Sequence, residues 1–124
     1  MRPFERVVAW QLCHRLALLT YRHTQDFPKS ELYGITSQMR RAATSAAANI
    51  VEGCAKRGTR EYARFVDIAV GSLAELSYFA LLARDLGILP GERYAEFERV
   101  QGEAGRTTMA LCRSLRSSSN RLPV

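Results

Sequence analysis

The stretch from Gln38 to Gly53 reads QMRRAATSAAANIVEG, with two arginines near its start, small residues through its middle and an Asn-x-x-Glu-Gly ending. Small side chains allow a helix to approach its neighbours closely, and residues three or four positions apart share one helical face. Polar residues recur at that spacing: Gln38, Arg41, Ser45, Asn49, Glu52 and Lys56. The stretch therefore predicts one helix that carries both a packing surface and a polar stripe.

Apolar residues with helical spacing predict further helices on either side of this stretch. The predicted helices run from Phe4 to about Thr24, from about residue 30 or 36 to Lys56, from Thr59 to Leu86, and from Gly91 to about Leu115. Short connections make sequential helices antiparallel neighbours. We therefore predict an all-α, antiparallel up-down-up-down four-helix bundle over residues 1–116, followed by a mobile C-terminal tail at 117–124.

Length and composition narrow the class of protein. The chain has 124 residues, of which 47% are hydrophobic and 24% charged, as in a soluble globular domain. No run reaches the ~18 apolar residues of a membrane span, and the N-terminus has no apolar signal-peptide core. We expect a cytoplasmic protein with no membrane partner. The three cysteines lie far apart, so we expect no metal site and no cofactor.

The basic charge is concentrated around one turn. The net charge is +6, and six basic residues between positions 40 and 64 face only two acidic ones, Glu52 and Glu61. Arginine suits bidentate phosphate binding, although a compositional bias of the genome also enriches it. The candidate contact residues are Lys56, Arg57 and Arg60 in the turn, with Arg40 as a further candidate. A solvated basic surface with no partner is the alternative.

The polar stripe also predicts a register between the second and third helices. If these helices turn about Gly58, residues at equal height pair as Arg41 with Glu75, Ser45 with Gly71, Asn49 with Asp67, and Glu52 with Arg64. We expect Ser45 and Gly71 to mark the closest approach of the helices, with a charge pair on either side. The alternative is that these residues are exposed and that their register is accidental.

Several motifs resemble one bacterial family. They are Trp10-Gln11, Phe27-Pro28-x-x-Glu31-x-x-Gly34, Gln38-x-Arg40-Arg41-Ala42-Ala43-x-Ser45, Asn49-Ile50-x-Glu52-Gly53 and Ala69-x-Gly71-Ser72-Leu73-x-Glu75-Leu76. Together they resemble the S23-like four-helix-bundle proteins encoded within intervening sequences of 23S ribosomal RNA genes. The resemblance implies a ring, with a homopentamer as the expected assembly, and no assigned role. It extends distantly to accessory proteins of diversity-generating retroelements, basic pentamers that bind a reverse transcriptase and its RNA.

Two functions follow, and a third is disfavoured. The first is a non-enzymatic oligomeric module that binds RNA or a ribonucleoprotein through the basic turn. The second is a scaffold or adaptor that acts through protein contacts, with aromatic residues such as Trp10, Tyr62, Tyr78 and Phe79 at subunit interfaces. Catalysis is disfavoured, because the sequence shows no phosphate-binding glycine loop, and a di-iron bundle would need histidines in helices two to four, which have none.

Overall fold

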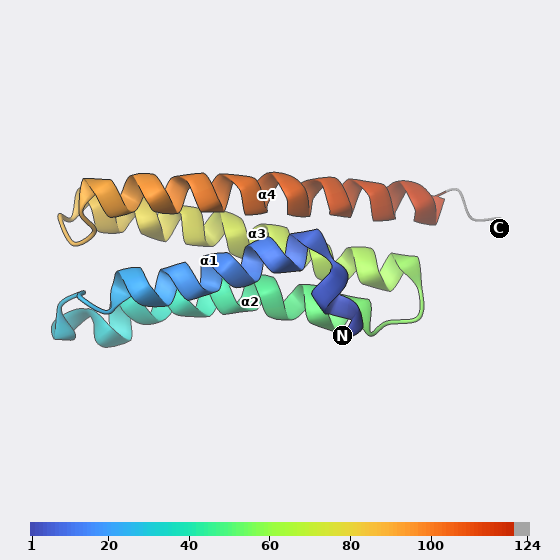
Figure 1. The fold of residues 1–124 in the computed structure, drawn as a ribbon, viewed down its shortest axis with the longest axis horizontal. Helices are drawn as coiled ribbons and strands as arrows, with labels where there is room; N and C mark the ends of the chain where they lie inside the picture. Colours follow the sequence, from blue (N-terminus) through green and yellow to red (C-terminus); the bar gives the residue numbers. More distant parts are fainter. Residues whose placement is uncertain (121–124) are drawn as a thin grey trace.

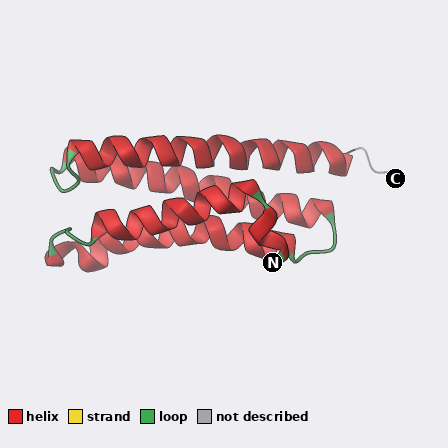
Figure 2. Cartoon of the chain, viewed as in Figure 1, coloured by secondary structure: helices red, strands yellow, loops and turns green. Residues whose placement is uncertain are grey.

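The computed structural model describes residues 1–120, and in this part of the chain it contains four α-helices and no strand. They are α1 (Val8–Thr24), α2 (Ser37–Cys54), α3 (Thr59–Asp85) and α4 (Gly91–Asn120). The helices lie side by side with alternating direction (Figure 1), and the connections between them are short (Figure 2). Both α1 and α3 pack against α2 and α4. The predicted all-α four-helix fold is confirmed.

One face of each helix supplies the core. Its largest fully buried side chains include Leu16 of α1, Met39 and Ile50 of α2, Leu76 of α3 and Phe97 of α4. Burying each such side chain stabilises the fold by roughly 1.5–3 kcal/mol. The buried positions between Met39 and Ile50 are alanines, so α2 lies against its neighbours through small side chains.

The fourth helix is longer than predicted. It continues to Asn120, so residues 117–120, which we predicted to belong to a mobile tail, are helical. The rest of that predicted tail, 121–124, lies outside the described residues. Packing of Phe97, Ala104 and Thr108 against the bundle outweighs the weak helix propensity of Gly102 and Gly105 in the interior of α4, since tertiary contacts supply most helical stability.

The connection from α1 to α2 contains two short helical turns, η2 (Lys29–Glu31) and η3 (Leu32–Thr36). Gly34 leaves helical geometry inside η3, with φ −104° and ψ −117°. The Glu31 carboxylate accepts a long hydrogen bond of 3.5 Å from the Ile35 amide, and a Cβ on Gly34 would lie 2.6 Å from that carboxylate. Within η3, Ile35 and Thr36 are buried, whereas Tyr33 is exposed to solvent.

The third helix keeps a large apolar surface exposed. The length and composition of α3 would allow it to cross a membrane, but core helices of soluble proteins often have the same length and composition. Only 33% of the most apolar 18-residue window of α3 is buried. Between Asp67 and Arg84 the helix carries a single charged residue, Glu75. Tyr78 and Leu81 are exposed on this stretch. We call the exposed side of α3 between residues 68 and 83 the apolar face of α3.

Candidate nucleic-acid interface

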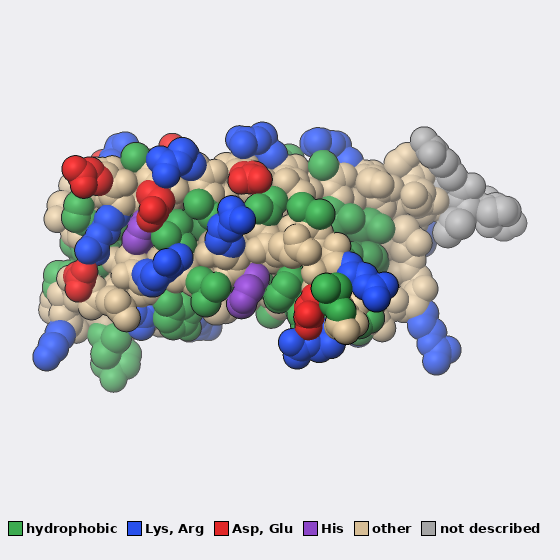
Figure 3. Space-filling view, viewed as in Figure 1, with side chains coloured by type: hydrophobic (Ala, Val, Ile, Leu, Met, Phe, Trp, Pro, Cys, Tyr) green, Lys and Arg blue, Asp and Glu red, His purple; other side chains and the backbone are tan. Residues whose placement is uncertain are grey.

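The structure brings three of the four candidate contact residues together at one end of the bundle. Lys56 and Arg57 lie in the turn after α2, and Arg60 lies in the first turn of α3. All three are exposed, and within residues 1–120 none of them forms an ion pair. Figure 3 shows a basic side chain projecting from this end, where Figure 1 places the α2–α3 connection. We call these three residues and Arg116 the basic end.

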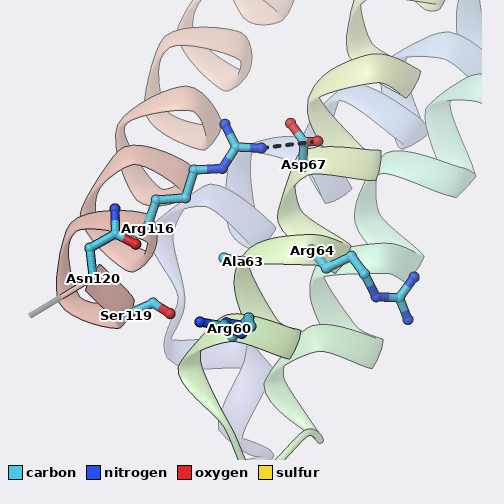
Figure 4. A pocket seen from close by; sticks show the side chains of 7 residues that line it. All are labelled: Arg60, Ala63, Arg64, Asp67, Arg116, Ser119 and Asn120. Carbon is cyan, nitrogen blue, oxygen red and sulfur yellow. Dashed lines mark ion pairs between the residues drawn. The ribbon is translucent and has the colours of Figure 1, made fainter. Parts of the chain in front are cut away.

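A hollow of about 360 Å³ lies beside the basic end, between the start of α3 and the end of α4. Arg60 lies near Ser119 and Asn120, and Arg116 reaches across to Asp67 (Figure 4). The Arg116 Nη2 atom is 3.1 Å from Asp67 Oδ2. Arg116 is not among the predicted contact residues, because the predicted fourth helix ends at about Leu115.

The positive end of α3 points toward the same region. Gly58 precedes the helix and has no side chain, so no side-chain cap satisfies the first amide groups of α3. These groups carry the partial positive charge of the helix dipole. The dipole and the arginines therefore favour an anion at the same place.

Arg40 lies at the opposite end of the bundle. Its Nε atom donates a 2.9 Å hydrogen bond to Thr24 Oγ1, and its guanidinium lies 4.7 Å from the centroid of the Tyr21 ring. The fourteen positions from Arg40 to Cys54, the last residue of α2, correspond to roughly 21 Å along the helix, and Lys56 lies beyond that end. Arg40 therefore cannot share one phosphate site with the other three candidates.

The second and third helices meet close to the predicted register, but with different partners. The Ser45 hydroxyl contacts that of Ser72 at 2.9 Å, one residue beyond the predicted Gly71. The prediction that Gly71 marks the closest approach is wrong, because a Cβ there would have nothing within 4 Å. At Gly53 a Cβ would lie 2.8 Å from Tyr62 Cδ1 and 3.1 Å from Phe65 Cβ. The close approach is therefore at Gly53.

The predicted charge pairs do not form in the described chain. Arg41 and Glu75 line one hollow of about 360 Å³ without an ion pair. Arg64, predicted to pair with Glu52, instead bonds Glu61 one turn earlier, at 3.1 Å. This hydrogen bond lowers the pKa of the Glu61 carboxyl. A local pair requires less side-chain ordering than a pair across helices, and such exposed pairs contribute little to stability.

The remaining predicted pair, Asn49 with Asp67, is also absent from the described residues. Asn49 Nδ2 donates to the Ser45 carbonyl at 2.8 Å and to the Ser45 hydroxyl at 3.1 Å. Asp67 is engaged by Arg116. Asn49 therefore orients Ser45 from within α2 rather than bridging the two helices.

Titratable side chains elsewhere are dispersed. Over residues 1–120, no group of three or more His, Cys, Asp or Glu residues could hold a metal ion. His23 is buried, with Nε2 2.8 Å from Glu96 Oε1. The Cys54 thiol donates to the Tyr62 hydroxyl at 3.2 Å, and burial of that hydroxyl raises its pKa.

Comparisons with known proteins identify relatives by sequence and by fold. The model of the family described as 23S rRNA-intervening sequence protein matches residues 5–109. The fold is similar to the crystal structure of a protein of unknown function from the S23 ribosomal protein family of Bacteroides thetaiotaomicron, with a TM-score of 0.77 and 17% identity. That similarity covers 86% of this chain and 96% of the other. Among curated proteins, none matches this chain. Because the matched segment spans most of the bundle, the chain belongs to the family of 23S rRNA-intervening sequence proteins.

Proposed function

We propose that this protein is a non-enzymatic, cytoplasmic module that binds RNA or a ribonucleoprotein through the basic end. One observation carries the proposal: Lys56, Arg57 and Arg60 are exposed together without a carboxylate partner. When such cations bind the phosphates of a nucleic acid, they displace the counterions bound there, and this release favours binding. The hollow beside them is lined by Arg60, Arg64 and Arg116 and by one carboxylate, Asp67, which pairs with Arg116, and it offers room for a phosphate group.

We further propose that the protein works as a ring, with a homopentamer as the expected form. The apolar face of α3 supports self-association, because exposed apolar side chains that lie together, here Ile68, Tyr78 and Leu81, mark interaction sites. In a ring each basic end is repeated in every subunit. Contacts that are weak one at a time then combine through multivalency.

The test is binding of total cellular RNA to the purified protein over a salt series. We would compare the wild type with a basic-end variant in which Lys56, Arg57 and Arg60 are all replaced by glutamine. Each lost contact to a single strand lowers the slope of log K against log salt by about 0.7, so we expect the slope to fall by about 2. A slope change of about 2, taken from about 1 M salt down to about 0.15 M, corresponds to a loss of about 50-fold in affinity near physiological salt.

A charge-matched control separates this site from general electrostatics. Arg15, Arg99 and Arg106 are exposed away from the basic end and form no ion pair within residues 1–120. Replacing these three by glutamine removes the same charge and should leave most of the affinity. Equal losses in both variants would show that net charge alone drives binding, and no binding by the wild type at low salt would rule the function out.

The second candidate is a scaffold that contacts proteins only. The apolar face of α3 is the observation that favours it, because Tyr78 and Leu81 stay exposed on a helix with almost no charge there. A Tyr78→Glu and Leu81→Glu variant should lower the oligomeric mass in sedimentation. If the wild type assembles but binds no RNA at low salt, the scaffold function is supported instead.

A further inference from the structure

We propose a second RNA contact at the opposite end of the bundle, where a hollow takes one unstacked base of a single strand together with its phosphate. The hollow has a volume of about 330 Å³, and Tyr21, Tyr33, Arg40 and Arg41 are among its lining residues. We call it the tyrosine hollow. Its volume lies within the range of about 300–1,000 Å³ typical of small-ligand sites. The inference rests on the proposed RNA-binding function, and it adds a site for the bases.

Tyr33 supplies an aromatic surface that the fold leaves uncovered. Its side chain is 93% exposed, although it belongs to a structured turn. Ile35 and Thr36, which follow Gly34 in the same turn, are buried and anchor the turn in the bundle. Glu31 accepts the Ile35 amide from the other side. The ring is therefore presented to solvent on an anchored backbone, as a stacking platform requires, since every base offers a π-face to an aromatic ring.

Arg40 is held in place for a phosphate. The hydrogen bond from its Nε to Thr24 and its position over the Tyr21 ring restrain the side chain. Neither of its terminal nitrogens forms a hydrogen bond to the protein within residues 1–120. Such preorganisation reduces the entropy lost when a ligand binds, and a guanidinium donates well to phosphate oxygens.

The charged residues that line the tyrosine hollow are two arginines, Arg40 and Arg41. Arg41 is exposed on its rim and forms no ion pair in the described part of the chain. No carboxylate is among the residues that line the hollow. Glu75 lines a neighbouring hollow, on the other side of Arg41. The charge of the tyrosine hollow therefore favours an anionic ligand. An uncharged protein surface would gain nothing from these arginines.

A single strand fits this arrangement better than a duplex. Bases in a duplex are stacked on each other and cannot lie on a tyrosine, whereas unpaired bases can. Figure 3 shows an apolar group projecting beside a basic one at the end where Figure 1 places the α1–α2 connection. The projecting surface can reach between splayed nucleotides, and the roughly 21 Å of α2 from Arg40 to Cys54 separates it from the basic end.

The test uses fluorescence polarisation with a labelled oligouridylate of about five nucleotides, which is near the smallest single-stranded site sizes. Tyr33→Ala should weaken binding by about 5- to 150-fold, the usual range for loss of one stacked base. The salt slope should stay unchanged, because stacking releases no counterions. Tyr33→Phe should bind as the wild type does, since the ring and not the hydroxyl is used. Arg41→Gln should instead lower the salt slope by about 0.7.

Controls distinguish this site from the basic end and from a protein interface. Tyr78→Ala removes another exposed tyrosine outside the hollow and should leave the affinity for the short probe unchanged. Tyr33→Ala should weaken short-probe binding by the same factor in the wild type and in the basic-end variant, because the two sites are separate. Circular dichroism and sedimentation of each variant would report fold and mass.

Each outcome decides between the two proposals. If Tyr33→Ala binds the short probe as the wild type does, or if its main effect is a lower oligomeric mass, the tyrosine hollow is not an RNA site. An effect of Tyr33→Ala that disappears in the basic-end variant would also overturn it. If Tyr33→Ala loses affinity while the basic-end variant keeps full affinity for long RNA, the hollow stands and the basic end fails.

Discussion

Replacing Gly53 by alanine tests how closely α2 and α3 approach each other. The new Cβ would lie 2.8 Å from Tyr62 Cδ1 and 3.1 Å from Phe65 Cβ, inside the optimal carbon–carbon separation of about 3.5–4.0 Å. The Tyr62 ring is restrained by its hydroxyl contact with Cys54 at 3.2 Å, so the helices themselves must move. Overpacking of this kind costs about 1–3 kcal/mol. Alanine regains at most about 1 kcal/mol through helix propensity. We expect a net loss of about 1 kcal/mol.

Gly71→Ala is the matched control, because it makes the same chemical change in α3 where a Cβ has nothing within 4 Å. It should stabilise the protein by about 0.5–1 kcal/mol. Urea unfolding followed by circular dichroism measures both changes, at one protein concentration because self-association affects apparent stability. The two variants should therefore differ by about 2 kcal/mol. If Gly53→Ala gains as much as Gly71→Ala, the helices are not in contact at this level.

Two further predictions concern hydroxyl and thiol groups that are buried or half-buried. Ser45→Ala should destabilise the protein by about 1 kcal/mol through loss of its hydroxyl contact with Ser72, and a cycle with Ser72→Ala should show that the two losses are not additive. In thiol labelling followed by mass spectrometry, Cys54 should react first in the native protein. Cys13 and Cys112 should be protected, because both are buried and burial raises their thiol pKa values, so their labelling should follow unfolding as urea is added.

Helix positions were predictable because they depend on local patterns. The apolar spacing and the stops at Pro28 and Gly87 predicted α3 and the end of α1 closely, and Gly87 does adopt a positive φ of 74°. The predicted start of the first helix at Phe4 was wrong, because residues 3–6 form a separate 3-10 turn and α1 begins at Val8. The end of α4 was not predictable from apolar spacing, since the helix continues to Asn120, beyond its last buried residue, Cys112. The two turns before α2 also depend on a tertiary anchor, the burial of Ile35.

The residues of the candidate sites also fall into two groups, those that the sequence could predict and those that it could not. Lys56, Arg57 and Arg60 could be selected because neighbours in a turn remain neighbours in the fold. Arg116 and the Tyr21 and Arg40 contact could not, because they join residues from different helices. Aromatic residues also give no sequence signal that distinguishes a buried ring from an exposed one such as Tyr33.

The sequence by itself determined the all-α class, the order of the helices, the family and the cluster of basic residues in one turn. These properties depend on periodicity, on turn residues and on motifs along the chain. Only the tertiary structure decided which partners meet. Ser45 lies against Ser72, Gly53 lies against α3, and Arg64 bonds within its own helix. A rotation of one residue, about 100° on a helix, changes the face that a side chain occupies, and only the packing of the whole bundle sets that rotation.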